Sequence, residues 1–181
     1  MGLILITFGV GIFAGQYYLP SLVVPPDAPV SFTGIQSEFC PSPECESLVT
    51  FTLAQAKSRA WVAMYSFTNQ TIAQALIDAK NRGVDVRVIV EKQQAAGQYS
   101  QHQEVFAAGI PVTIDTNPQL MHHKFAVIDD GAVITGSMNW TGNGVGENNE
   151  NELVIHSSEL NQKFALEFQK VWDESNAYGG E

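Results

Sequence analysis

The chain has 181 residues, with 9 basic and 19 acidic side chains and a formal net charge of -10. This charge excludes a protein that binds nucleic acid tightly through its overall charge, because sequence-independent binding draws most of its affinity from cations on phosphates. The chain carries no RNA-recognition or zinc-finger pattern, which argues against a sequence-specific reader of nucleic acid.

The first 24 residues, Met1 to Val24, contain no charged side chain. A stretch of this length can span a bilayer, and Tyr17 and Tyr18 lie where interfacial aromatic residues are common. Because a basic start and a small-residue cleavage site are both missing, we favour a retained membrane anchor over a cleaved signal peptide. We place a linker and first strand at residues 25–37, a folded domain at 38–176 and a tail at 177–181.

Charge and cysteine positions predict the compartment. The first basic residue is Lys57, so the positive-inside rule does not hold the domain in the cytoplasm. We expect an extracytoplasmic domain, which would be secreted if the N-terminal segment were cleaved. Cys40 and Cys45 bracket a short loop; outside the cytoplasm a disulfide is favoured, with free thiols or half of a zinc site as the alternatives.

Hydrophobic periodicity predicts alternating helices and strands. Helices are expected at Glu44 to Ala60, Thr71 to Asn81, Gln101 to Ala108 and Leu160 to Trp172, and strands at Trp61 to Phe67, Val84 to Val90 and Val112 to Asp115. The glycine-rich segment at 142–146 is expected to be a flexible loop. This order predicts an α/β fold: one domain with a mixed β-sheet flanked by helices on both faces.

A β-hairpin is expected between the strand at Val112 to Asp115 and the helix at Leu160 to Trp172. Alternating side chains at 123–128 predict a strand, Asp129-Asp130-Gly131 a tight turn, and the apolar run at 132–135 a returning strand. The two open ends of such a hairpin lie together.

Four polar side chains stand at these open ends. Two-residue periodicity places His122 and Lys124 on one face of the first strand, and Ser137 and Asn139 on one face at the exit of the second. His123 points to the other face and is expected to be structural. The four side chains can therefore converge on one small anion.

The spacing resembles the signature of the phospholipase D superfamily: His, one residue, Lys, four residues, Asp, six residues, Gly-Ser, and an Asn shortly after. Residues 61–92 and 147–157 are also similar to the compact single-motif bacterial endonucleases of that superfamily. The resemblance covers roughly residues 30–176 and implies a phospholipase D-like α/β/α sandwich. The matching residues are His122, Lys124, Asp129, Gly136, Ser137 and Asn139.

The resemblance implies a phosphodiesterase that uses no metal and no cofactor. In that superfamily one His forms a phosphohistidine, and a second protonates the leaving group and then activates water. Lys124, Ser137 and Asn139 would neutralise the non-bridging oxygens of the phosphodiester. Asp129 would have a supporting role, either ordering the turn or holding Lys124.

Glu150 completes the expected catalytic set of His122, Lys124, Asp129 and Glu150. It stands where single-motif nucleases carry a glutamate that orients the histidine. Its neighbours Glu147 and Glu152 are expected to be solvated.

The chain has a single copy of the motif, so the second His must come from elsewhere. The simplest source is an identical subunit, with His122 of each chain facing the other across a two-fold axis. We therefore expect an obligate homodimer.

Three functions remain open. The first is a membrane-anchored nuclease that cuts DNA or RNA with little sequence preference, and the second is a phospholipid hydrolase or transphosphatidylase. The third and weakest is a non-catalytic phosphodiester-binding protein. A nuclease would need a local strip of cations, for which the candidates are Lys57, Arg59, Arg82, Arg87, Lys92 and Lys124.

Overall fold

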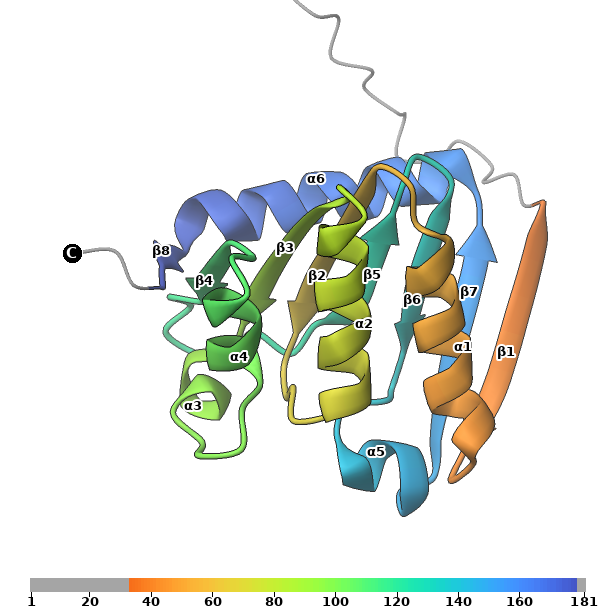
Figure 1. Cartoon of the computed structure of the whole chain (residues 1–181), viewed down its shortest axis with the longest axis horizontal. Helices are drawn as coiled ribbons and strands as arrows, with labels where there is room; N and C mark the ends of the chain where they lie inside the picture. The colour runs from red at the N-terminus through yellow and green to blue at the C-terminus, as the bar shows by residue number, and fades with distance from the viewer. Residues whose placement is uncertain (1–32, 179–181) are drawn as a thin grey trace, which may run out of the picture.

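The computed structural model describes residues 33–178, which form an eight-stranded mixed sheet with the strand order β1-β7-β6-β5-β2-β3-β4-β8 (Figure 1). The strands are β1 (Gly34–Cys40), β2 (Arg59–Met64), β3 (Asp85–Val90), β4 (Val112–Ile114), β5 (Lys124–Ile128), β6 (Ala132–Gly136), β7 (Glu150–His156) and β8 (Asn176–Ala177). The helices are α1 (Pro43–Gln55), α2 (Gln70–Asn81), α3 (Lys92–Ala95), α4 (His102–Ala107), α5 (Gly142–Gly146) and α6 (Ser158–Glu174).

The predicted α/β fold with helices on both faces of a mixed sheet is confirmed. β2, β3 and β4 are parallel, while β5, β6 and β7 run antiparallel to their neighbours. Helices α1 and α2 cover the front face in Figure 1, and the long α6 covers the back. A larger apolar core lies under α1 and α2, and a smaller one under α6.

The predicted hairpin forms as expected. β5 and β6 pair from Phe125 opposite Thr135 to Ile128 opposite Ala132. Because β5 is antiparallel to β2 and begins beside its carboxyl end, the start of β5, the exit of β6 and the start of β7 meet at the lower edge of the sheet in Figure 1. This edge brings together the candidate catalytic side chains.

The first helix is shorter than predicted. It ends at Gln55 rather than Ala60, and β2 begins at Arg59. The main-chain amides of Lys57, Ser58 and Arg59 donate to the carboxylate of Asp129, so they cannot continue the helical hydrogen-bond pattern. β2 also ends at Met64, before the predicted Phe67.

The structure also shifts both ends of the predicted domain. β1 runs to Cys40, past the expected end of the linker at residue 37, and Asn176–Ala177 form β8 at the start of the predicted tail. No helix within residues 33–178 is both long and apolar enough to cross a bilayer. The predicted anchor at residues 1–24 lies outside the described residues and stays a prediction.

Candidate active site

The site is built around the contact between His122 and Lys124. The ammonium Nζ of Lys124 lies 3.2 Å from both ring nitrogens of His122 and 3.2 Å from its main-chain carbonyl. Burial, and then the neighbouring Lys124 and His123, hold the pKa of His122 below its ordinary value. A lowered pKa favours the neutral imidazole, which is the state that can attack phosphorus.

Lys124 lies in a polar and aromatic setting. Burial lowers the pKa of Lys124, and the carboxylate of Glu150 acts in the opposite direction. Its Nζ lies 5.2 Å from the ring centroid of Tyr65, within the range of a cation–π interaction. A phosphodiester oxygen placed beside this ammonium would also lie beside His122.

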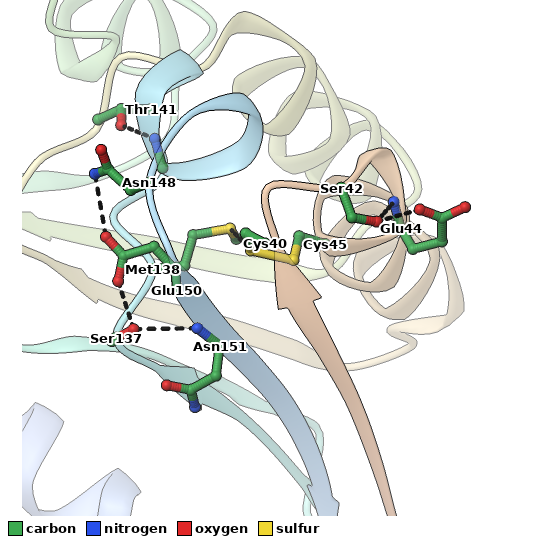
Figure 2. The surroundings of a disulfide bond; sticks show 11 residues. Cys40, Ser42, Glu44, Cys45, Ser137, Met138, Thr141, Asn148, Glu150 and Asn151 are labelled. Atoms are coloured by element: carbon green, nitrogen blue, oxygen red, sulfur yellow. Dashed lines mark hydrogen bonds between the residues drawn. A yellow bond between two sulfur atoms is a disulfide. The ribbon is translucent and has the colours of Figure 1, made fainter.

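Ser137 and Glu150 form the second part of the site (Figure 2). The Ser137 hydroxyl donates to Oε2 of Glu150 and accepts from the main-chain amide of Asn151 at 3.1 Å. Asn148 Nδ2 donates to the other oxygen, Oε1 of Glu150, at 3.2 Å. The carboxylate is thus fixed between two polar side chains, and no hydrogen bond joins it to His122 within the described chain.

Gly136 makes this arrangement sterically feasible. A Cβ atom at Gly136 would lie 2.1 Å from the main-chain oxygen of Asn151, closer than atoms can approach. The main chain before Ser137 can therefore pack against β7 only because residue 136 has no side chain. This explains the glycine of the Gly-Ser pair.

The glycine-rich segment after the motif is a short helix, α5, so the prediction of a flexible loop is wrong. Thr141 caps this helix, and its Oγ1 accepts from the amide of Gly144 at 3.0 Å. A Cβ at Gly144 would lie 2.3 Å from the carbonyl of Asn139. The glycine thus permits a close turn directly after Asn139, whose buried side-chain oxygen has no hydrogen-bond partner.

Asp129 does not reach the site. It follows β5 at the edge opposite to Lys124, roughly 16 Å away at a strand rise of 3.3 Å per residue. Its carboxylate accepts from the amide and hydroxyl of Ser58 at 2.7 and 2.9 Å and from the amide of Arg59 at 3.0 Å. The carboxylate thus holds the connection between α1 and β2 rather than its own hairpin turn, and the alternative that it holds Lys124 is wrong.

The backbone and the pKa of Asp129 agree with this role. The residue has φ 47°, in the left-handed region that aspartate tolerates better than most residues. Burial acts to raise the pKa of Asp129, but the hydrogen bonds from Ser58, Arg59 and Lys57 outweigh it and hold that pKa below the ordinary value. The charged carboxylate of Asp129 therefore stabilises the α1–β2 connection at the edge of the sheet opposite to the site.

We call the surface formed by the side chains of His122, Lys124, Ser137 and Glu150 the motif face. The rings of the other histidines contact residues outside it. His123 points to α6 as expected, with Nε2 3.3 Å from Oε1 of Glu167. His102 is buried in α4 against Tyr178, and His156 ends β7. All four histidines of the chain lie in the described residues, and only His122 contacts Lys124, although His123 also lines the hollow beside α6.

The predicted strip of cations is not continuous: Lys92 contacts Asn117 in a hollow that His122 also lines, but the arginines lie elsewhere. Arg59 donates to the carbonyl of Asp129 at the far edge of the sheet, and Arg87 lies over the ring of Trp61 at 4.7 Å. Neither Arg59 nor Arg87 therefore lies beside Lys124. Instead a hollow beside His122 adds Lys163 of α6, which the sequence analysis missed.

Three further residues near the site escaped prediction. Tyr65 packs against His122 just after β2, and Glu91 is fully buried just after β3. Glu152 was expected to be solvated, but its side chain is 1% exposed in the register position opposite Gly136. The sequence offered one signal for them: Tyr65 and Glu91 directly follow β2 and β3, and Glu152 lies two residues after Glu150. Within residues 33–178 no group of three His, Cys, Asp or Glu side chains is placed to hold a metal ion.

The structure joins Cys40 and Cys45 by a disulfide. The bridge links the end of β1 to the first turn of α1 (Figure 2). The Sγ of Cys40 lies 3.5 Å from the Sδ of Met138, the residue between Ser137 and Asn139. The disulfide therefore supports the segment that carries two of the site residues.

Comparisons with known proteins agree with the geometry. The family described as "Cardiolipin synthase, PLD-like domain" matches residues 49–172. A mitochondrial cardiolipin hydrolase of Chlamydomonas reinhardtii is 35% identical over 136 residues, covering 75% of this chain and 61% of the relative. A phospholipase D of Rickettsia prowazekii is 30% identical over 148 residues, covering 82% of this chain and 72% of the relative. The chain thus spans about three fifths of the length of the first of these relatives.

A solved structure matches over nearly its whole length. The phospholipase D family member Nuc from Salmonella typhimurium superposes with a TM-score of 0.76 and 32% identity, covering 81% of this chain and 99% of the other. NucT from Helicobacter pylori has a TM-score of 0.71 at 22% identity, which shows likeness of fold alone.

Proposed function

Because the chain belongs to the phospholipase D superfamily, we propose that it is a metal-independent phosphodiesterase in which His122 attacks phosphorus. The observation that carries this proposal is the contact of 3.2 Å between the Lys124 ammonium and the His122 ring. Burial and then the ammonium lower the pKa of the nucleophile, and the ammonium lies where the charge of a phosphodiester must be offset. No other pair among the described residues combines these two properties on the motif face.

The reaction follows from this pair. A ring nitrogen of His122 forms a bond to phosphorus, the bond to the leaving oxygen breaks, and a protonated second histidine gives its proton to that oxygen. The second histidine, now neutral, takes a proton from water, and the resulting hydroxide displaces His122 from phosphorus. Lys124, Ser137 and Asn139 offset the charge on the non-bridging oxygens.

The second histidine is proposed to be His122 of an identical subunit. The His123 ring contacts Glu167, and His102 and His156 lie elsewhere in the fold, so one chain places one imidazole against Lys124. A two-fold axis beside the lower edge of the sheet would bring two copies together. Glu150 of either chain is then the candidate to orient an imidazole.

Mixing experiments test the shared site. A dimer of one wild-type chain and one His122→Ala chain holds a single His122, so an excess of the variant should suppress wild-type turnover after subunit exchange. His156→Ala is the matched control, because His156 ends β7 at the edge of the sheet opposite to Glu150. Activity that resides in a monomer by analytical ultracentrifugation would contradict this mechanism.

For the substrate we propose nucleic acid cut with little sequence preference, with phospholipid as the second candidate. The resemblance to the compact single-motif endonucleases supports the first. Cations from two elements, Lys124 and Lys163, line the hollow beside His122, and they suit a phosphate backbone.

Exposed apolar side chains favour the second candidate. Leu120 and Phe39 are 40% and 75% exposed near the site, and Leu160 and Phe164 line the hollow beside His122. The curated relative from Chlamydomonas is named a cardiolipin hydrolase. Apolar surface beside a phosphodiester site suits a substrate with acyl chains.

A direct assay separates the candidates. The chain is incubated in excess EDTA with single-stranded DNA, double-stranded DNA, RNA, or cardiolipin vesicles, beside His122→Ala and His156→Ala. Cleavage of a nucleic acid that His122→Ala abolishes supports the nuclease, and release of phosphatidic acid supports the lipid hydrolase. Activity that EDTA abolishes, or that persists in His122→Ala, contradicts the mechanism.

We also propose that residues 1–24 anchor the protein and that the domain faces away from the cytoplasm. The Cys40–Cys45 disulfide supports this orientation, because such bonds persist in oxidising compartments. Membrane fractionation with protease protection of intact cells or spheroplasts tests the proposal. A domain protected from external protease would contradict it.

A further inference from the structure

Tyr65 lies directly against the two catalytic side chains. Its amide donates to the carbonyl of His123 at 2.8 Å, which continues the β2–β5 pairing by one residue. Its ring centroid is 4.5 Å from that of His122, with an interplanar angle of 59°. The same ring lies 5.2 Å from Nζ of Lys124. One aromatic side chain therefore contacts both members of the pair that would carry the reaction.

The hydroxyl of Tyr65 is fixed in turn. Gln94 Nε2 donates to it at 3.2 Å, and the amide of Gln94 donates to Oε2 of Glu91 at 2.8 Å. Glu91 is 0% exposed and ends the loop after β3 as the N-cap of α3. The fully buried Glu91 thus holds Gln94, and Gln94 in turn holds the hydroxyl of Tyr65.

His122 needs such a support. Its side chain is exposed, and its only hydrogen-bond partner among the described residues is Lys124. Asp129 lies at the other edge of the sheet, and Glu150 is bonded to Ser137 and Asn148. Among residues 33–178 of one chain, no carboxylate therefore fixes the orientation of the imidazole.

We propose that Tyr65 is a positioning residue, held through Gln94 and Glu91, that fixes the His122 imidazole and the Lys124 ammonium in the relation needed for attack on phosphorus. The inference rests on the proposed function and adds to it the residue that orients the nucleophile. A nucleophile displaced by about 1 Å can lose roughly 100-fold in rate, so a rigid aromatic wedge has a large effect through geometry alone.

The ring also covers one side of the imidazole, which is otherwise exposed. Burial is the largest cause that lowers the pKa of His122, ahead of Lys124 and His123. The other titratable groups that face this region are Tyr65 itself, Glu150 beside Lys124, and Lys163 and Glu167 of α6. Removing the ring opens one side of the imidazole, so the pKa of His122 should rise.

The first arm of the test measures catalysis on bis(p-nitrophenyl) phosphate, a substrate common to both proposed activities. Using the full chain, Tyr65→Leu should lower kcat by roughly 10- to 100-fold with a smaller change in KM. Tyr65→Phe keeps the ring and should lose only about fivefold, the equivalent of one neutral hydrogen bond. Gln94→Leu should match Tyr65→Phe, and the double variant should lose no more than either, because both remove the same bond.

The second arm is independent of activity. The pKa of His122 is read by NMR titration, with its resonances assigned through His122→Ala. It should move upward in Tyr65→Leu and stay constant in Tyr99→Leu, a control at a ring that is 71% exposed. A wild type that hydrolyses no phosphodiester, with a His122 pKa that still moves in Tyr65→Leu, would overturn the proposed function and leave the contact standing.

Two results would overturn the inference itself. The first is a folded Tyr65→Leu variant, by circular dichroism, with wild-type kcat and an unchanged pKa of His122. The second result can be obtained even if Tyr65→Leu does not fold. If the losses of kcat in Tyr65→Phe and Gln94→Leu add in the double variant, the coupling energy between the two side chains is zero.

Discussion

Cys40 and Glu150 are direct partners in the β1–β7 register, so the Cys40–Cys45 disulfide lies beside the carboxylate of the candidate site (Figure 2). The same bridge contacts Met138, which separates Ser137 from Asn139. Covalent support at this edge is useful, because β1 is the edge strand and pairs only with β7 among the described strands. The disulfide closes the corner where β1 turns into α1.

Removing this bridge should destabilise the domain moderately. The two cysteines are separated by 5 positions, and closing so short a loop is worth about 2 kcal/mol in the unfolded chain. We expect the Cys40→Ser/Cys45→Ser variant to lose about that free energy of unfolding, measured in urea without reductant. Reductant should produce the same loss in the wild type and none in the variant. Equal stability of the two proteins without reductant would contradict the prediction.

Gly136→Ala should disrupt the site and the sheet together. The new methyl group would lie 2.1 Å from the main-chain oxygen of Asn151, and neither main chain can move without breaking the β6–β7 pairing. We expect a loss of about 1–3 kcal/mol in stability and a large loss of kcat through Ser137. Gly131→Ala is the matched control, because a Cβ at Gly131 in the hairpin turn meets nothing within 4 Å. Comparable effects in the two variants would contradict the steric explanation.

Much of the fold could be predicted because its signals are local. The hairpin was predicted from alternation and an Asp-Asp-Gly turn, and the ends of α2 and α4 from Gly83 and Gly109, which have φ 93° and 82°. The end of α1 could not be predicted in this way. It depends on amide groups that bind Asp129, some 70 residues later, and no local pattern encodes a contact at that separation.

The site was predictable in its residues but not in its connections. His122, Lys124, Ser137 and Glu150 come together because strand alternation and hairpin closure are strong constraints. Tyr65 was missed although it lay inside the predicted strand Trp61 to Phe67, because alternation gives the side of the sheet but not the contacts made across it. Its role depends on contacts with three other segments.

Asp129 should contribute to stability and leave the chemistry unaffected. Asp129→Ala removes the acceptor of the amides of Ser58 and Arg59, which we expect to lower the free energy of unfolding by about 2 kcal/mol. Under conditions where the variant is folded, its kcat should stay near the wild-type value. A fall as large as that of His122→Ala would restore the catalytic role first expected for Asp129.

The pH dependence of this contribution has a definite sign. The pKa of Asp129 is lowered in the folded protein, so its stabilisation is fully present above its unfolded pKa of about 3.9. The stabilisation is lost as pH falls through the lower folded pKa. Urea unfolding of wild type and Asp129→Ala should therefore differ at pH 7, and the difference should shrink below about pH 3.9. A difference that grows in acid would contradict the assignment.

Glu152 should act in the opposite direction. Burial, and then the nearby Glu150, raise the pKa of Glu152 to about 8, whereas an unfolded glutamate titrates near pH 4.3. The folded protein must therefore hold a proton that the unfolded chain releases, and the contribution of Glu152 to stability is lost as pH rises from about 4.3 to the folded pKa.

Glu152→Gln keeps the shape of the side chain and removes this titration. Relative to wild type, its free energy of unfolding should rise by up to about 1.4 kcal/mol per pH unit over that interval and level off above it. Urea unfolding at pH 5, 7 and 9 checks the trend, with Glu147→Gln as the control at an exposed position of the same chain segment. Parallel pH profiles for wild type and Glu152→Gln would show that the buried carboxyl group does not hold its proton.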